Sequence, residues 1–139
     1  MFTYICLGTN DLARSIRFYD PVLGALGLRR CDVSGEPDWE EWAGWGTYEA
    51  HGAREVALWV CKPFNGLPAT RGNGVMVALA AASWQAVDRF HAAAIANGGA
   101  SEGVPGLRPQ YNADFFAAYV RDPDGNKLAA VCRGFTSPQ

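Results

Sequence analysis

Residues 3–28 read TYICLGTNDLARSIRFYDPVLGALGL and set the pattern for the first half of the chain. Apolar side chains alternate over residues 3–8, which predicts a strand whose side chains point to two sides. Asp11 can accept hydrogen bonds from free backbone amides, so we expect a helix to begin directly after it. Apolar residues then recur at helical spacing until Gly27, a common helix terminator. Pro21 lies inside this pattern and is expected to kink or divide the helix.

The remainder of the first half is rich in β-branched and aromatic residues. It predicts three further strands, over residues 28–33, 41–49 and 55–61. Together with the first strand and helix, they form a βαβββ unit over about residues 1–62, called module one. Residues 63–73 are rich in proline and glycine and form the best candidate for a linker.

The second half repeats this order as module two, over about residues 74–133. Its expected elements are a strand over residues 75–80, a helix capped by Ser83, a short strand near Ala100, a loop containing Pro105, and hairpin strands over residues 115–120 and 127–132. A shift of 72 residues places Tyr4 on Met76 and Gly27 on Gly99, as an internal duplication would. We therefore expect one α+β domain over residues 1–139, built from two tandem modules.

Composition narrows the class of protein. A chain of 139 residues with 49% hydrophobic and 19% charged residues can bury a substantial core. Its 12 basic and 14 acidic residues give a net charge of −2, which disfavours nucleic acid as a partner. The first residues carry no basic stretch, and no apolar run approaches the ~20 residues that span a bilayer. We expect a soluble cytoplasmic protein without a membrane partner.

Four cysteines lie at positions without CxxC spacing, and three of them fall in strand-like apolar runs. Unpaired cysteine behaves as a small hydrophobic residue in a core, and disulfides are rare in the cytosol. We therefore expect buried free thiols, with a reactive thiol at Cys6 as the alternative.

Two segments carry a resemblance to a known family. Residues 7–14 (LGTNDLAR), followed by FYD at 18–20 and LGALGL at 23–28, resemble the opening of glyoxalase/bleomycin-resistance proteins, the vicinal oxygen chelate superfamily. Residues 117–126 (AAYVRDPDGN) resemble its closing hairpin. The resemblance implies a curved mixed sheet or partial barrel with helices outside, and a ligand-binding cleft often found in a dimer.

In metal-using members of that superfamily, side chains on the first and last strands of each module hold a divalent ion. The resemblance carries these places to Tyr4, Leu58, Met76 and Ala129. None of the four is a usual ligand for such an ion, which prefers imidazole or carboxylate groups. His51 and His91 are the only histidines, and we expect surface or packing roles for both. The sequence therefore predicts no metal and no other cofactor.

Strand alternation predicts the composition of the cleft. If Tyr4 faces it, so does Cys6, and the same reasoning applied to the other strands gives an apolar floor. Aromatic and polar residues near the strand ends would form its rim, and Trp42 and Trp45 should point to opposite sides of their strand. Trp59 and Trp84 are expected in the core. The predicted ligand-binding residues are Tyr4, Cys6, Trp42, Leu58, Met76, Ala78, Arg108, Tyr111 and Ala129.

An apolar, aromatic cleft suits a flat aromatic compound. Our leading hypothesis is a homodimeric, metal-free protein that binds an aromatic or drug-like molecule, similar to the sequestering resistance proteins of the superfamily. The first alternative is a glyoxalase-like or dioxygenase-like enzyme with an atypical or metal-free site, in which Tyr4 polarises a carbonyl. The second is a dimeric interaction module whose aromatic residues form an interface. The sequence identifies no catalytic residue.

Overall fold

The computed structural model describes residues 1–138. Module one contains strand β1 (Tyr4–Gly8), helix α1 (Leu12–Gly24), strand β2 (Trp42–Glu49), the short 3-10 helix η1 (Ala50–Gly52) and strand β3 (Arg54–Cys61). Module two contains strand β4 (Val77–Ala80), helix α2 (Trp84–Ala96), and strands β5 (Ala100–Leu107), β6 (Phe116–Arg121) and β7 (Lys127–Cys132). The α+β class predicted from the sequence is confirmed, and the predicted βαβββ order is complete in module two.

The strands form two separate sheets. The first sheet has the order β1-β3-β2, and the second has the order β4-β7-β6-β5. In each sheet the first strand of the module pairs in parallel with the last, and the remaining neighbours are antiparallel. Within residues 1–138, no strand of one sheet lies close to a strand of the other, and the two sheets do not close into a barrel.

The strand predicted over residues 28–33 does not form, which leaves the first sheet one strand smaller than the second. The chain makes a single bridge there, between Arg30 and Trp45 of β2. The Asp32 carboxylate then accepts a hydrogen bond from the amide of Ser34, at 3.0 Å, and turns the chain away from β2. A local side-chain bond of this kind competes with the backbone ladder of a sheet.

Both helices begin where the sequence predicted. The Asp11 carboxylate caps α1 by accepting from the amide of Arg14, and the Ser83 hydroxyl caps α2 by accepting from the amide of Ala86. Pro21 lies inside α1, and of the two predicted effects, a kink or a division, the division does not occur. The missing amide of Pro21 removes one backbone hydrogen bond, but the capped start and the buried apolar face keep the helix continuous.

Pro105 lies inside β5 rather than in a loop. β5 is at the edge of the second sheet, and its pairing with β6 is interrupted by two shifts of register. Edge strands with bulges tolerate proline because one side of the backbone needs no partner. None of the helices in residues 1–138 is long and apolar enough to cross a membrane.

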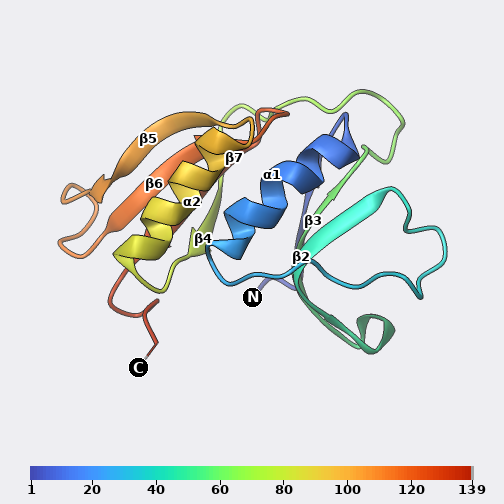
Figure 1. The fold of residues 1–139 in the computed structure, drawn as a ribbon, viewed down its shortest axis with the longest axis horizontal. Helices are drawn as coiled ribbons and strands as arrows, with labels where there is room; N and C mark the ends of the chain where they lie inside the picture. Colours follow the sequence, from blue (N-terminus) through green and yellow to red (C-terminus); the bar gives the residue numbers. More distant parts are fainter. Residues whose placement is uncertain (139) are drawn as a thin grey trace.

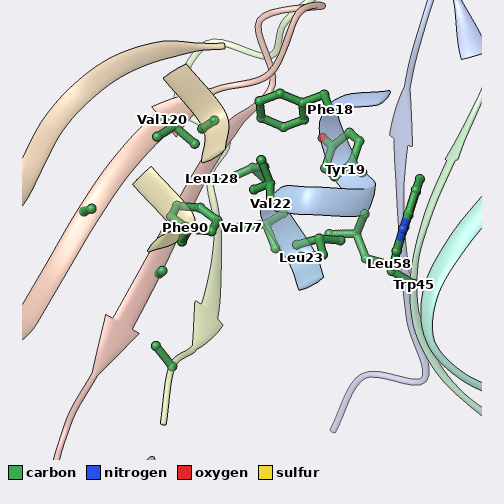
Figure 2. Packing of buried hydrophobic residues seen from close by; sticks show 14 of the residues in the cluster. Phe18, Tyr19, Val22, Leu23, Trp45, Leu58, Val77, Phe90, Val120 and Leu128 are labelled. Atoms are coloured by element: carbon green, nitrogen blue, oxygen red, sulfur yellow. The ribbon is translucent and has the colours of Figure 1, made fainter. Parts of the chain in front are cut away.

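The two helices pack against each other and against one face of each sheet (Figure 1). We call these the inner faces of the sheets, and the opposite faces their open faces. Phe18, Tyr19 and Leu23 of α1 and Phe90 of α2 are fully buried in this core, together with Trp45 of the first sheet (Figure 2). The helices therefore cover the inner faces and leave the open faces for other contacts.

Polar bonds join the two modules near the β6–β7 turn. The Asp124 carboxylate accepts hydrogen bonds from the Thr9 hydroxyl at 2.6 Å and from the Arg14 guanidinium at 2.8 Å. The buried Tyr19 hydroxyl donates to the Asp122 carboxylate at 2.6 Å. The hairpin of module two is thus fixed to the start of α1 in module one.

Candidate functional site

β1 presents alternate side chains to the two sides of the first sheet. Ile5 and Leu7 pack toward the core, whereas Tyr4 and Cys6 are exposed on the open face. Tyr4 has 55% of its surface exposed. The predicted orientation of these four residues is therefore confirmed, since alternation along a strand separates them into two sets.

The two faces of β3 are exchanged relative to the prediction. Tyr4 pairs with Ala57 and Cys6 pairs with Trp59, and paired residues share a face of the sheet. Trp59 therefore belongs to the open face and not to the helix-facing core. Leu58 points the other way, into the core, with only 4% of its surface exposed. The predictions for Leu58 and Trp59 were wrong because a shift of one residue exchanges the two faces of a strand.

An aromatic cluster covers part of this open face. The Trp39 ring lies 5.8 Å from Trp42, 5.3 Å from Tyr48 and 5.0 Å from Trp59, measured between ring centroids. Tyr48 also meets Trp59 edge to face, with centroids 5.5 Å apart. Gly44 lies directly beneath the Trp59 ring, where any side chain would overlap it. We call Trp39, Trp42, Tyr48 and Trp59 the aromatic cluster.

Trp42 and Trp45 lie on opposite faces of β2, as predicted. Trp45 is 99% buried in the core, and its indole donates a hydrogen bond to Asp20 at 2.9 Å. Trp42 pairs with Cys61 across the strands and is only partly buried. Of the two, Trp42 is the one that belongs to the open face.

Two cavities adjoin the predicted residues of module one. A cavity of about 520 Å³ has Cys6, Cys61, Trp42 and Phe64 in its wall, and the linker after β3 forms much of the remainder. A second, of about 250 Å³, lies between the modules. Its wall includes Phe2, Tyr4, Val56, Leu58, Leu79 and Ala80. Tyr4 and Cys6 thus stand at two neighbouring apolar hollows, and the few exposed atoms of Leu58 reach the smaller one.

The second sheet has an open face of its own. Ala78 is exposed there, because Val77 and Leu79 on either side pack toward the core. Met76, immediately before β4, is 43% exposed. Ala129 pairs with Ala78 and shares its face, but it is fully buried and offers no surface to a ligand.

Tyr119 is a feature of this face that the sequence reasoning missed. It pairs with Ala129, and the Arg108 guanidinium lies 5.5 Å from its ring centroid, with the Lys127 ammonium at 5.7 Å on the same ring. Burial raises the pKa of Tyr119, and the nearby Tyr111 raises it further. The alternation of β6 together with the position of Ala129 was the signal that could have identified it.

Arg108 directly follows β5 and is held in place by that strand. Its guanidinium donates to the carbonyl of Gly106 at 2.8 Å and to that of Val104 at 2.6 Å. Tyr111, in the loop that follows, is 63% exposed and meets Phe115 edge to face. The structure therefore brings Arg108 and Tyr111 to the second sheet, away from the residues of β1 and the aromatic cluster.

The positions that the resemblance assigned to metal ligands hold no suitable donor set. Within residues 1–138, no three histidine, cysteine, aspartate or glutamate side chains converge as a metal ion would require. His51 bonds to Glu36 and His91 bonds to Ser101, each at 2.9 Å and at the surface. The residues present do not fit the metal site of the metal-using relatives.

The match to known proteins covers nearly the whole chain. Residues 2–130 match the family profile described as the Glyoxalase/Bleomycin resistance protein/Dioxygenase superfamily. The chain belongs to this superfamily. A crystal structure of a glyoxalase/bleomycin resistance protein from Albidiferax ferrireducens T118 is 38% identical, with a TM-score of 0.79, over 96% of this chain and 98% of that chain.

Other members are more distant. Glyoxalase I from Zea mays is 26% identical with a TM-score of 0.60, and the match spans 94% of this chain but 45% of that one. A glyoxalase-related enzyme from Fulvimarina pelagi shares the fold, with 21% identity and a TM-score of 0.68 over 96% of this chain and 88% of that chain. No curated protein matches the sequence significantly.

Proposed function

We propose that this member of the superfamily binds a flat aromatic molecule on the open face of the first sheet, without a metal ion. The observation that carries the proposal is the aromatic cluster beside the larger cavity, where Trp42 adjoins Cys6 on an apolar wall. Aromatic rings of a ligand gain about 0.5–1.5 kcal/mol per favourable ring pair beyond the burial of their surface. Exposed Tyr4, on the same face, adds a hydroxyl that can orient a polar substituent.

The donor chemistry of the site supports binding without a metal. Tyr4 and Ala57, which face each other across β1 and β3, offer one phenol and one methyl group. Glu55 lies on the same face, but its carboxylate already accepts a hydrogen bond from the Trp59 indole at 2.7 Å. A hard cation would need further oxygen or imidazole ligands that this face does not supply.

We also propose that the protein forms a homodimer in which the open face of module two of one copy covers the open face of module one of the other. In one chain these faces lie on different sheets, and within residues 1–138 no strand of one sheet pairs with a strand of the other. Phe2, Tyr4 and Met76 have between 43% and 71% of their surface exposed. Clusters of exposed apolar groups mark association surfaces. A second copy would bring Arg108 and Tyr119 to the ligand.

Tryptophan fluorescence tests the binding proposal. Protein of known metal content is titrated with a panel of aromatic and peptide-like compounds before and after treatment with a chelator. We expect saturable quenching by one compound class, unchanged by the chelator and at least tenfold weaker in Trp42→Ala, a loss of about 1.4 kcal/mol. Trp84→Ala is the matched control, because Trp84 is 49% exposed and stacks on Phe116 in module two.

The same experiment separates the alternatives. Stoichiometric metal whose removal abolishes quenching would contradict the proposal and favour a metal enzyme. Chemical conversion of the bound compound, detected by chromatography and mass spectrometry, would favour a metal-free enzyme using Tyr4.

Sedimentation tests the proposed dimer, for which we expect twice the 15.0 kDa mass of the chain. A dimer that binds no compound of the panel would favour an interaction module.

A further inference from the structure

Two cysteines from neighbouring strands meet on the open face of the first sheet. Cys6 lies on β1 and Cys61 ends β3, and their sulfur atoms are 3.4 Å apart although the residues are 55 positions apart in the chain. Cys6 is exposed and Cys61 is buried. We propose that Cys6 and Cys61 form a reversible oxidation site, in which a hydroperoxide converts the two thiols to a disulfide between β1 and β3. This inference does not depend on the proposed ligand.

The geometry favours this pair over any other among the four cysteines. The two sulfurs must approach each other by roughly 1.4 Å to reach the ~2.05 Å of a disulfide bond, a distance that rotation of an exposed side chain on a strand can supply. The Cys132 sulfur contacts the Ser137 hydroxyl at 3.9 Å, and Cys31 is half-buried in the segment beside β2.

The surroundings give a small oxidant access to both sulfurs. Both cysteines line the cavity of about 520 Å³, which also contains Trp42 and Phe64. Burial, together with the hydrogen bond to Cys6, raises the pKa of Cys61 to about 12, so Cys61 remains a thiol at neutral pH. The exposed Cys6 is therefore the thiol that meets the oxidant first.

The reaction proceeds in two balanced steps. The Cys6 sulfur attacks the peroxide bond, takes one oxygen to become a sulfenic acid, and releases one alcohol or water molecule from the hydroperoxide. The Cys61 sulfur then attacks the sulfenic sulfur, the S–S bond forms, and the hydroxyl leaves as water with the proton of the Cys61 thiol. Two thiols are oxidised by two electrons in total, and one hydroperoxide is reduced.

Tryptic mapping tests the proposal directly, because each cysteine lies on a different tryptic peptide. Trypsin cuts after arginine and lysine but not before proline, so Lys62-Pro63 stays intact. Cys6 is then on residues 1–14, Cys61 on 55–71, Cys31 on 31–54 and Cys132 on 128–133. The folded protein is treated with hydrogen peroxide, remaining thiols are alkylated under denaturing conditions, and the peptides are separated without reduction.

We expect peroxide to reduce the number of alkylated thiols from four to two and to produce one linked species, 1–14 with 55–71, which dithiothreitol separates. Cys31→Ser should give the same linked species, whereas Cys6→Ser should lose it. Cys6→Ser changes an exposed residue and therefore keeps the test valid if Cys61→Ser fails to fold. Four remaining thiols, a link to 31–54, or Cys6 accumulating as a sulfinic acid without a link would each overturn the proposal.

Discussion

Substitution of Gly44 by alanine tests the position of the Trp59 ring, on which the open face depends. A Cβ at this position would lie 2.7 Å from Cδ2 of the ring and closer still to its six-membered part. The ring has little freedom to move away, because its indole donates to Glu55 at 2.7 Å and Trp39 packs against it. The backbone of Gly44 is not in the left-handed region, so alanine adds no backbone strain at this position.

The magnitude follows from two opposing effects. Overpacking of this kind costs about 1–3 kcal/mol, since the ring must tilt and lose part of its contacts. Alanine also reduces the number of backbone conformations open to the unfolded chain, which stabilises the folded state by about 0.4–1 kcal/mol. From the middle of these two ranges, we expect Gly44→Ala to lower the free energy of unfolding, measured by urea denaturation, by about 1–2 kcal/mol. The tryptophan fluorescence of the folded state should also change.

Gly24→Ala is the matched control. Gly24 is the last residue of α1, and no atom lies within 4 Å of a Cβ built there. Alanine in a helix is favoured over glycine by about 0.5–1 kcal/mol, so this variant should be unchanged or more stable. If Gly44→Ala were as stable as Gly24→Ala, the Trp59 ring would not cover Gly44, and the open face described for β3 would be incorrect.

Two further predictions concern polar bonds outside the site. Tyr19→Phe removes the buried hydrogen bond to Asp122 and should lower the free energy of unfolding by about 1.5–3 kcal/mol in urea, whereas a loss below about 0.5 kcal/mol would contradict its role in joining the modules. The backbone amide of Gly134, which donates a hydrogen bond to the Asp114 carboxylate, lowers the pKa of that carboxyl from its ordinary value. Because a lowered carboxyl pKa stabilises the fold above the unfolded value, stability should fall as the pH drops below about 4, and less steeply in Asp114→Asn. Equal slopes for the two proteins would refute this.

The features that local sequence decides were predictable. Asp11 and Ser83 cap the two helices because a cap needs only a short side chain at the right place before an apolar helical repeat. The alternation of residues 4–8 assigned Tyr4 and Cys6 to one face without any knowledge of the partner strand.

The register of β3 could not be predicted in the same way. Leu58 and Trp59 are both large and apolar, so alternation alone does not say which of them faces the helices. The pairing of Tyr4 with Ala57 decides it, and this pairing depends on the positions of β1 and α1 in three dimensions. Trp59 was assigned to the wrong face for this reason, and the aromatic cluster was incomplete without it.

The division of the first sheet into two faces explains why its fold was easier to predict than its function. Leu58 and its neighbours on the inner face fill space between the sheet and α1, so their size and polarity are fixed by packing. Tyr4, with 55% of its surface exposed, and its partner Ala57 carry no such constraint. Side chains at these two positions can be exchanged at little cost to the core, which lets one scaffold hold metal ligands in one protein and an apolar, aromatic surface in another. The chemistry of such a site must therefore be derived from the residues on the open face and not from the fold that positions them.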